Sequence, residues 1–158
     1  MRLRLLCRCK GENSMKIKVV YHSMTGNTKK LAQEIADELK VKAETTEEIN
    51  TTFLSPVDLL LIGDGIYAGK ASKGMLEFIE KLDAKMVKNA AVFATYGGQD
   101  KIGEDLSELL RNKGITVIAD AFTCKGKAWF IANRKHPDTQ DIVGARTYAR
   151  DAITKIKS

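Results

Sequence analysis

Residues 22–28 form the segment of this sequence whose side chains are best suited to hold an anion. They read His22-Ser23-Met24-Thr25-Gly26-Asn27-Thr28 and lie between an apolar run and an amphipathic stretch. Hydroxyl groups can donate hydrogen bonds, glycine lets the backbone approach a ligand closely, and N–H groups at a following helix start point to the same place. The segment therefore predicts a phosphate-binding loop built from Ser23, Met24, Thr25, Gly26, Asn27 and Thr28.

Two common nucleotide-binding loops do not fit this segment. It has neither the Gly-Lys-Ser/Thr of a P-loop nor the Gly-x-Gly-x-x-Gly of a Rossmann dinucleotide site. Nucleoside triphosphates and dinucleotides are therefore disfavoured as ligands. The alternative is an ordinary turn between a strand and a helix, in which Ser and Thr only cap the helix.

Two further segments place glycines after apolar runs, where loops of an α/β protein reach a ligand. The first reads Gly63-Asp64-Gly65-Ile66-Tyr67-Ala68-Gly69-Lys70, and the second reads Phe93-Ala94-Thr95-Tyr96-Gly97-Gly98-Gln99-Asp100. A third stretch, 122–137, is longer and leads into the last amphipathic segment.

The elements that must position these loops alternate along the chain. Short apolar runs predict strands at about 16–21, 41–45, 58–62, 90–95 and 115–122. Apolar residues at helical spacing predict four helices between and after them, at about 31–39, 76–82, 102–110 and 142–156. Such alternation indicates an α/β fold with a doubly wound parallel sheet, whose ligands bind at the carboxyl ends of the strands. The loops at 22–28, 63–73, 95–101 and 123–137 are therefore expected to meet.

Tyr21 to Thr28 resembles the phosphate loop of the flavodoxins, whose pattern is a Ser or Thr, one residue, Thr-Gly, one residue and Thr. The resemblance extends over Lys16 to Lys157, because the order of strands and loops agrees as well. It implies a flavodoxin-like three-layer sandwich with a five-stranded parallel sheet in the order 2-1-3-4-5. It also implies one non-covalently bound FMN.

The resemblance also implies which residues contact the flavin ring. These are Gly65, Ile66, Tyr67, Ala68 and Gly69 in one loop, and Thr95, Tyr96, Gly97, Gly98 and Gln99 in the other. Tyr67 would stack on the ring, although an isolated exposed aromatic at the sheet edge is the alternative. The peptide between Ala68 and Gly69 would turn its carbonyl toward the reduced ring. The family usually has Gly at the first position of this pair. Gly98 stands where many flavodoxins have an aromatic residue.

The resemblance favours an electron carrier that docks on redox partner proteins through the rim around the flavin, with no catalytic residues of its own. An open ring face at Gly98 suits the alternative, a flavin-dependent oxidoreductase acting on a quinone-like or porphyrinogen substrate. The loop at 65–70 is similar to that of flavodoxin-like protoporphyrinogen oxidases. A third alternative is a domain that has lost flavin and serves only as an interaction module.

Cysteine and histidine usage predicts no metal site. His22 and His136 have no Cys or acid at a ligand spacing, and no Ser-His-Asp or paired-carboxylate arrangement is apparent. Cys124, next to Lys125, is either a reactive thiol or a small residue buried at a strand end, of which burial is the more common. Three cysteines without a disulfide framework favour a reducing cytoplasm.

The net charge of +6 owes about half its excess to the first 14 residues, and the other basic residues are scattered among acids. No nucleic-acid footprint is therefore expected, and no apolar stretch is long enough for a membrane helix. Residues 1–14 are expected to lie outside the fold as an extension, and 15–158 to form the FMN-binding domain. The alternative for the extension is a Cys-Arg-Cys redox or metal tag at 7–9.

Overall fold

The structure is a computed structural model of the chain. It describes residues 14–51, 56–66, 69–98, 101–126 and 136–158. The expected extension at 1–14 lies outside these residues except for Ser14, so the domain boundary stays a prediction.

Strands and helices alternate over most of the described chain. The strands are β1 (Ile17–Tyr21), β2 (Ala43–Thr45), β3 (Val57–Gly65), β4 (Val87–Tyr96), β5 (Thr116–Val117) and β6 (Phe122–Lys125). The helices are α1 (Asn27–Leu39), α2 (Lys73–Glu80), α3 (Ile102–Asn112) and α4 (Thr139–Lys157).

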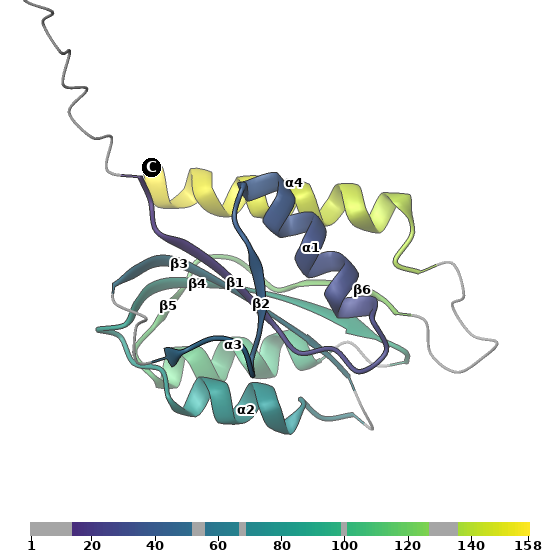
Figure 1. Cartoon of the computed structure of the whole chain (residues 1–158), viewed down its shortest axis with the longest axis horizontal. Coiled ribbons are helices and arrows are strands. Elements are labelled where there is room, and N and C mark those ends of the chain that lie inside the picture. The colour runs from purple at the N-terminus through teal and green to yellow at the C-terminus, as the bar shows by residue number, and fades with distance from the viewer. Residues whose placement is uncertain (1–13, 52–55, 67–68, 99–100, 127–135) are drawn as a thin grey trace, which may run out of the picture.

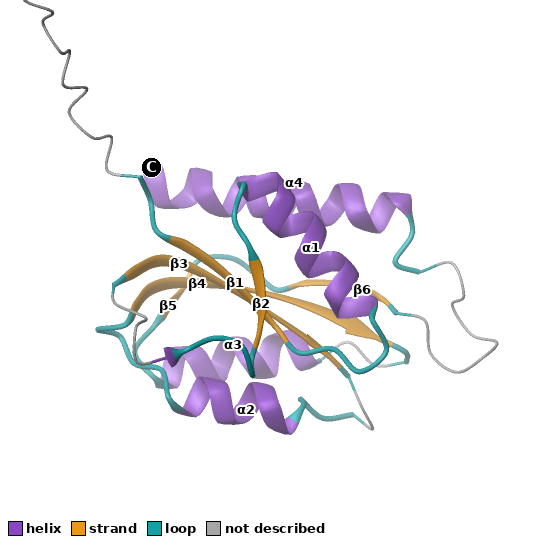
Figure 2. Cartoon of the chain, viewed as in Figure 1, coloured by secondary structure: helices purple, strands orange, loops and turns teal. Residues whose placement is uncertain are grey.

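The strands form one parallel sheet in the order β2-β1-β3-β4-β5, and β6 also pairs with β4. The sheet lies between two helix layers, with α1 and α4 on one side and α2 and α3 on the other (Figure 1). Figure 2 shows the same three layers, with the strands in orange between the purple helices. The predicted three-layer sandwich and its strand order are confirmed.

The unbroken apolar run in β3 is explained by burial on both faces. Leu59 and Leu61 pack with α1 and α4, whereas Leu60 and Ile62 pack with α2 and α3. All four side chains are fully buried, as expected for a central parallel strand whose faces are both covered by helices.

The predicted fifth strand at 115–122 is wrong in one respect, because it is interrupted. Between the pairs Ala90–Val117 and Phe93–Phe122, β4 advances three residues while its partner advances five. The extra residues bulge out of the ladder between β5 and β6. The backbone N–H of Val92, opposite this bulge, donates to the Tyr148 hydroxyl of α4 at 3.3 Å. A side chain from α4 thus replaces a missing strand partner.

None of the described helices is both long enough and apolar enough to span a bilayer.

Candidate functional site

The predicted phosphate loop lies at the carboxyl end of β1 and leads directly into α1. Two of its hydroxyl oxygens accept hydrogen bonds from inside the loop: Ser23 Oγ from the Gly26 N–H and Thr25 Oγ1 from the Asn27 amide, both at 3.0 Å. A hydroxyl that accepts in this way keeps its own hydrogen for another acceptor. Ser23 and Thr25 can therefore still donate hydrogen bonds while they accept these.

The start of α1 is open, which here means that it has neither a side-chain cap nor an acid in its first turn, whereas each other described helix has at least one of the two. Its N-cap is Gly26, which has φ 88°. By contrast, α2 and α4 are capped by Ser72 and Asp138, and α3 carries Glu104 and Asp105 in its first turn. The first N–H groups of a helix have no partner inside it, so an open start is a preformed anion site.

Two other strands close against this loop. Thr28, which is almost fully buried, shares a hydrogen bond of 2.9 Å with Thr95 at the end of β4. Gly126, after β6, lies so close that a Cβ there would be 2.7 Å from the Asn27 amide nitrogen. The structure thus brings together the loop at 22–28, the end of β4 and the segment Cys124-Lys125-Gly126. A side chain at 126 would have to displace the Asn27 amide, a contact that the sequence did not reveal.

The second predicted loop follows β3. Gly65 is the last residue of β3, and the next residue, Ile66, donates its N–H to the Thr95 carbonyl at 3.0 Å. Further along the loop, Gly69 has φ 75°. Gly65, Ile66 and Thr95 are therefore adjacent, and their contact with a flavin ring stays a prediction. Tyr67 and Ala68 lie outside the described residues, so stacking and peptide turning stay predictions.

The third predicted loop follows β4. Tyr96 is half-buried at the strand end, and its carbonyl accepts the Gly126 N–H at 2.8 Å. Gly97 and Gly98 are exposed, and a Cβ added at Gly98 would meet no atom within 4 Å. Gln99 lies outside the described residues. The described part of this loop is thus open to solvent next to the first two loops.

Acidic residues lie near both histidines, which the sequence spacing did not reveal. The His22 ring nitrogens lie 3.7 Å from the buried Asp64 carboxylate and 3.9 Å from Glu47. Near the start of α4, His136 Nδ1 lies 2.7 Å from Asp141 and 3.7 Å from Asp138.

Atoms of His136, Asp138 and Asp141 lie within 4.8 Å of one another. The two aspartates form a capping box, in which Asp138 accepts the Asp141 N–H and Asp141 accepts the Asp138 N–H. This arrangement satisfies the helix start by itself, and the expectation of no metal stays a prediction.

For Cys124, the sequence left two alternatives, a reactive thiol or a small residue buried at a strand end. It is buried, pairs in register with Thr95, and burial together with Asp141 and Asp138 raises the pKa of its thiol to about 12. A raised pKa is the opposite of what a reactive thiol needs. The buried-residue alternative is confirmed.

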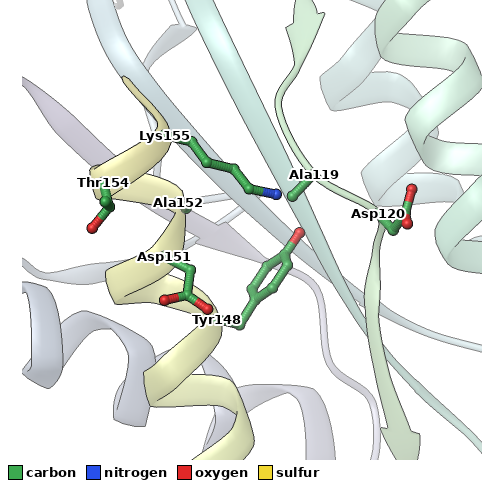
Figure 3. Close-up of a pocket in the computed structure, with 7 residues that line it drawn as sticks. All are labelled: Ala119, Asp120, Tyr148, Asp151, Ala152, Thr154 and Lys155. Carbon is green, nitrogen blue, oxygen red and sulfur yellow. The ribbon is translucent and has the colours of Figure 1, made fainter. Parts of the chain in front are cut away.

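A separate hollow of about 420 Å³ lies beside the bulge of the fifth strand (Figure 3). Its lining comes from the bulge and from the second half of α4: Ala119, Asp120, Tyr148, Asp151, Ala152, Thr154 and Lys155. Tyr148 and Lys155 reach toward the bulge, whereas Thr154 points away. None of the sequence-predicted site residues lines this hollow.

Comparisons with known proteins agree with the fold. A family model described as a flavodoxin domain matches residues 18–128. An uncharacterized protein of Methanocaldococcus jannaschii is 31% identical over 150 residues, which cover 88% of this chain and 99% of the relative. A flavodoxin of Clostridium beijerinckii is 35% identical over 114 residues, which cover 65% of this chain and 80% of that flavodoxin.

Among solved structures, a flavodoxin from the domain Archaea superimposes with a TM-score of 0.76. The alignment covers 91% of this chain and 100% of that one, at 23% sequence identity. At this identity the likeness shows the fold alone.

Proposed function

Because this chain belongs to the flavodoxin family, we propose that it binds FMN non-covalently and carries electrons between redox proteins. The observation that carries the proposal is the open start of α1, at which a glycine cap and two hydroxyl donors meet with no acid in the first turn. A dianionic phosphate fits such a start, since the helix dipole and the N–H groups of the first turn both favour negative charge and no acid there opposes it.

In this proposal, Ser23, Thr25 and Thr28 hold the phosphate together with the first N–H groups of α1. The hydroxyl hydrogens of Ser23 and Thr25 are not used inside the loop, because both oxygens act there as acceptors. Thr28 can also donate when Thr95 donates to it.

The ring would lie between the loops that follow β3 and β4. Gly65, Ile66 and Gly69 would border it on one side and Thr95, Tyr96, Gly97 and Gly98 on the other, with Tyr67, Ala68 and Gln99 completing the contacts. FMN, when bound, supplies reversible one- and two-electron chemistry, and the protein sets its potential by charge, stacking and hydrogen bonds.

Partner proteins would dock on the rim around the ring. Met24, at the tip of the phosphate loop, is 71% exposed and offers an apolar contact for such a partner. Large exposed apolar side chains near a cofactor suit short-lived protein contacts.

The first test is the visible spectrum of the purified protein, with the bound cofactor identified by mass. Thr25→Ala removes a donor that is exposed and makes no contact with the core. We expect it to weaken FMN binding about tenfold or more, since hydrogen bonds to charged groups are strong. Thr139→Ala, at the exposed start of α4, is the control and should leave the affinity unchanged. Equal affinities in wild type and Thr25→Ala would refute the phosphate-loop assignment.

The exposed Gly98 favours a second candidate function, a flavin-dependent oxidoreductase acting on a quinone-like or porphyrinogen substrate. Redox titration separates the two. Two well-separated one-electron steps at low potential support a carrier, whereas rapid two-electron turnover with a quinone supports the enzyme.

A further inference from the structure

Asp64 is a fully buried carboxylate that lies directly under one of the proposed ring loops. It is the penultimate residue of β3, and its side chain has no exposed surface. A buried charged group costs free energy unless its oxygens are satisfied, so its presence at this position needs an explanation.

The Asp64 carboxylate joins the two described ends of the loop between β3 and α2. One oxygen accepts the Gly65 N–H at 2.9 Å, and the other accepts the Ser72 N–H at 2.8 Å. Ser72 in turn caps α2 by accepting the Met75 N–H at 3.2 Å. The carboxylate thus fixes where the chain leaves the sheet and where it enters α2.

The surroundings of Asp64 show how its charge is balanced. His22 from the first loop lies 3.7 Å away, and the exposed Glu47 lies on the other side of the imidazole. Burial raises the pKa of the Asp64 carboxyl, while the Ser72 and Gly65 hydrogen bonds and the nearby His22 act in the opposite direction. The His22 ring also lies close to α2. A Cβ added at Gly74, in the first turn of that helix, would be 3.1 Å from the ring.

We propose that Asp64 is a positioning residue for the flavin ring, an inference that rests on the proposed function. Its carboxylate holds Gly65–Ile66 and Gly69–Ser72 at a fixed separation, so that these segments are preorganised to receive the ring. Its negative charge, kept out of water beside the ring, disfavours adding electrons there and lowers the midpoint potential.

The central experiment compares Asp64→Asn with Asp58→Asn. Asparagine can accept with only one side-chain oxygen, so one of the two N–H groups loses its acceptor in Asp64→Asn. Asp58 is the matched control, since it lies at the other end of β3 and also accepts a backbone N–H, from Lys16 at 2.8 Å.

Binding of FMN and of riboflavin, which lacks the phosphate, is measured for both variants together with the midpoint potential. We expect Asp64→Asn to weaken both ligands by the same factor, about fivefold to tenfold, and to raise the potential. Asp58→Asn should change none of the three.

A second pair of variants separates the two roles of Asp64, which are to hold the loop ends in position and to supply a negative charge. The same pair tests the proposal if Asp64→Asn fails to fold. Ser72 has φ −64°, which suits proline, so Ser72→Pro removes the N–H that Asp64 accepts and keeps the carboxylate. Ser72→Ala removes only the hydroxyl, which caps α2 and also bonds to the Asp64 carboxylate, and keeps the backbone N–H. Relative to Ser72→Ala, Ser72→Pro should weaken FMN and riboflavin equally without raising the potential.

The outcomes distinguish the inference from the function on which it rests. If the wild-type protein binds neither flavin, the proposed function fails and this inference fails with it. If the wild type binds flavin but neither Asp64→Asn nor Ser72→Pro weakens riboflavin, only the positioning role is overturned. An unchanged or lower potential in Asp64→Asn overturns the role of the charge.

Discussion

Helices α1 and α4 lie side by side on one face of the sheet and begin at the same end of it, yet their first turns differ (Figure 1). The N-cap of α1 is Gly26 with φ 88° and no side-chain cap, whereas that of α4 is Asp138 in an extended conformation within a capping box. At the third helical position, α1 has Lys29 where α4 has Asp141. The start of α1 thus has neither a side-chain cap nor an acid, whereas the start of α4 is capped by its own side chains.

Their packing does not explain this difference. Arg146 pairs with Glu34 and Arg150 pairs with Glu38 along the contact between the two helices. The Lys30 ammonium donates to the Pro137 carbonyl at 2.8 Å, which ties the two starts together. Capping normally stabilises a helix, so the missing cap at α1 supports the proposed phosphate site there.

The largest expected effect comes from giving α1 the acid that α4 already has. Lys29→Asp places a carboxylate in the first turn of α1, close to the proposed phosphate. We expect FMN affinity to fall about tenfold or more, because like charges a few ångströms apart repel. Fluorescence titration measures it. Gln140→Glu, in the first turn of α4, is the control, and a similar loss there would remove the distinction between the two starts.

The next effect concerns the backbone of the α1 cap. Gly26→Ala should lower the free energy of unfolding by about 1 kcal/mol, because the left-handed conformation is unfavourable for alanine. No atom lies within 4 Å of the added Cβ, so no clash contributes. Gly98→Ala also meets no neighbour and has no positive φ, and it should be nearly neutral. Urea unfolding compares the two, and equal losses would contradict the backbone explanation.

At α4, Asp138→Ala should reduce stability with a distinct pH dependence. The hydrogen bond from the Asp141 N–H, with the nearby His136, lowers the pKa of the Asp138 carboxyl. Its contribution is therefore present above the unfolded value of about 3.9 and is lost as pH falls through the lower folded value.

The melting temperatures of wild type and Asp138→Ala should differ at pH 7 and converge in strong acid. Asp138→Asn keeps an acceptor and should retain most of the stability. FMN affinity should not change in either variant, and a tenfold loss would show that the start of α4 also serves the ligand.

The smallest expected effect tests the link between the two starts. Lys30→Met removes the hydrogen bond to the Pro137 carbonyl while keeping a long apolar stem. We expect a loss of about 0.5 kcal/mol in unfolding free energy, measured by urea denaturation. Lys157→Met, at the exposed end of α4, should have no effect, and an equal loss there would show that the link contributes nothing specific.

The sequence was sufficient for the fold because its signals are local. The apolar run at 59–62 and the helical spacing at 31–39 each have one good structural explanation. The interruption of the fifth strand was missed because Tyr148, which accepts the Val92 N–H opposite it, lies far away in the chain.

For the candidate site, the hydroxyl loop was predicted from residue types alone. The Asp64 and Gly126 contacts were not, since a buried carboxylate and a close approach at a glycine become visible only when distant segments meet. Spacing along the chain also hid the acids beside His22.

The bulge in the fifth strand also affects how this protein meets other copies of itself. A long, straight outer strand offers unpaired N–H and C=O groups to any chain that can add a strand there. Here one outer edge of the described sheet is divided into β5, of two residues, and β6, of four. The other edge, β2, has only three. Short and bent outer strands give a second copy little to pair with, so both edges are protected against strand-to-strand aggregation.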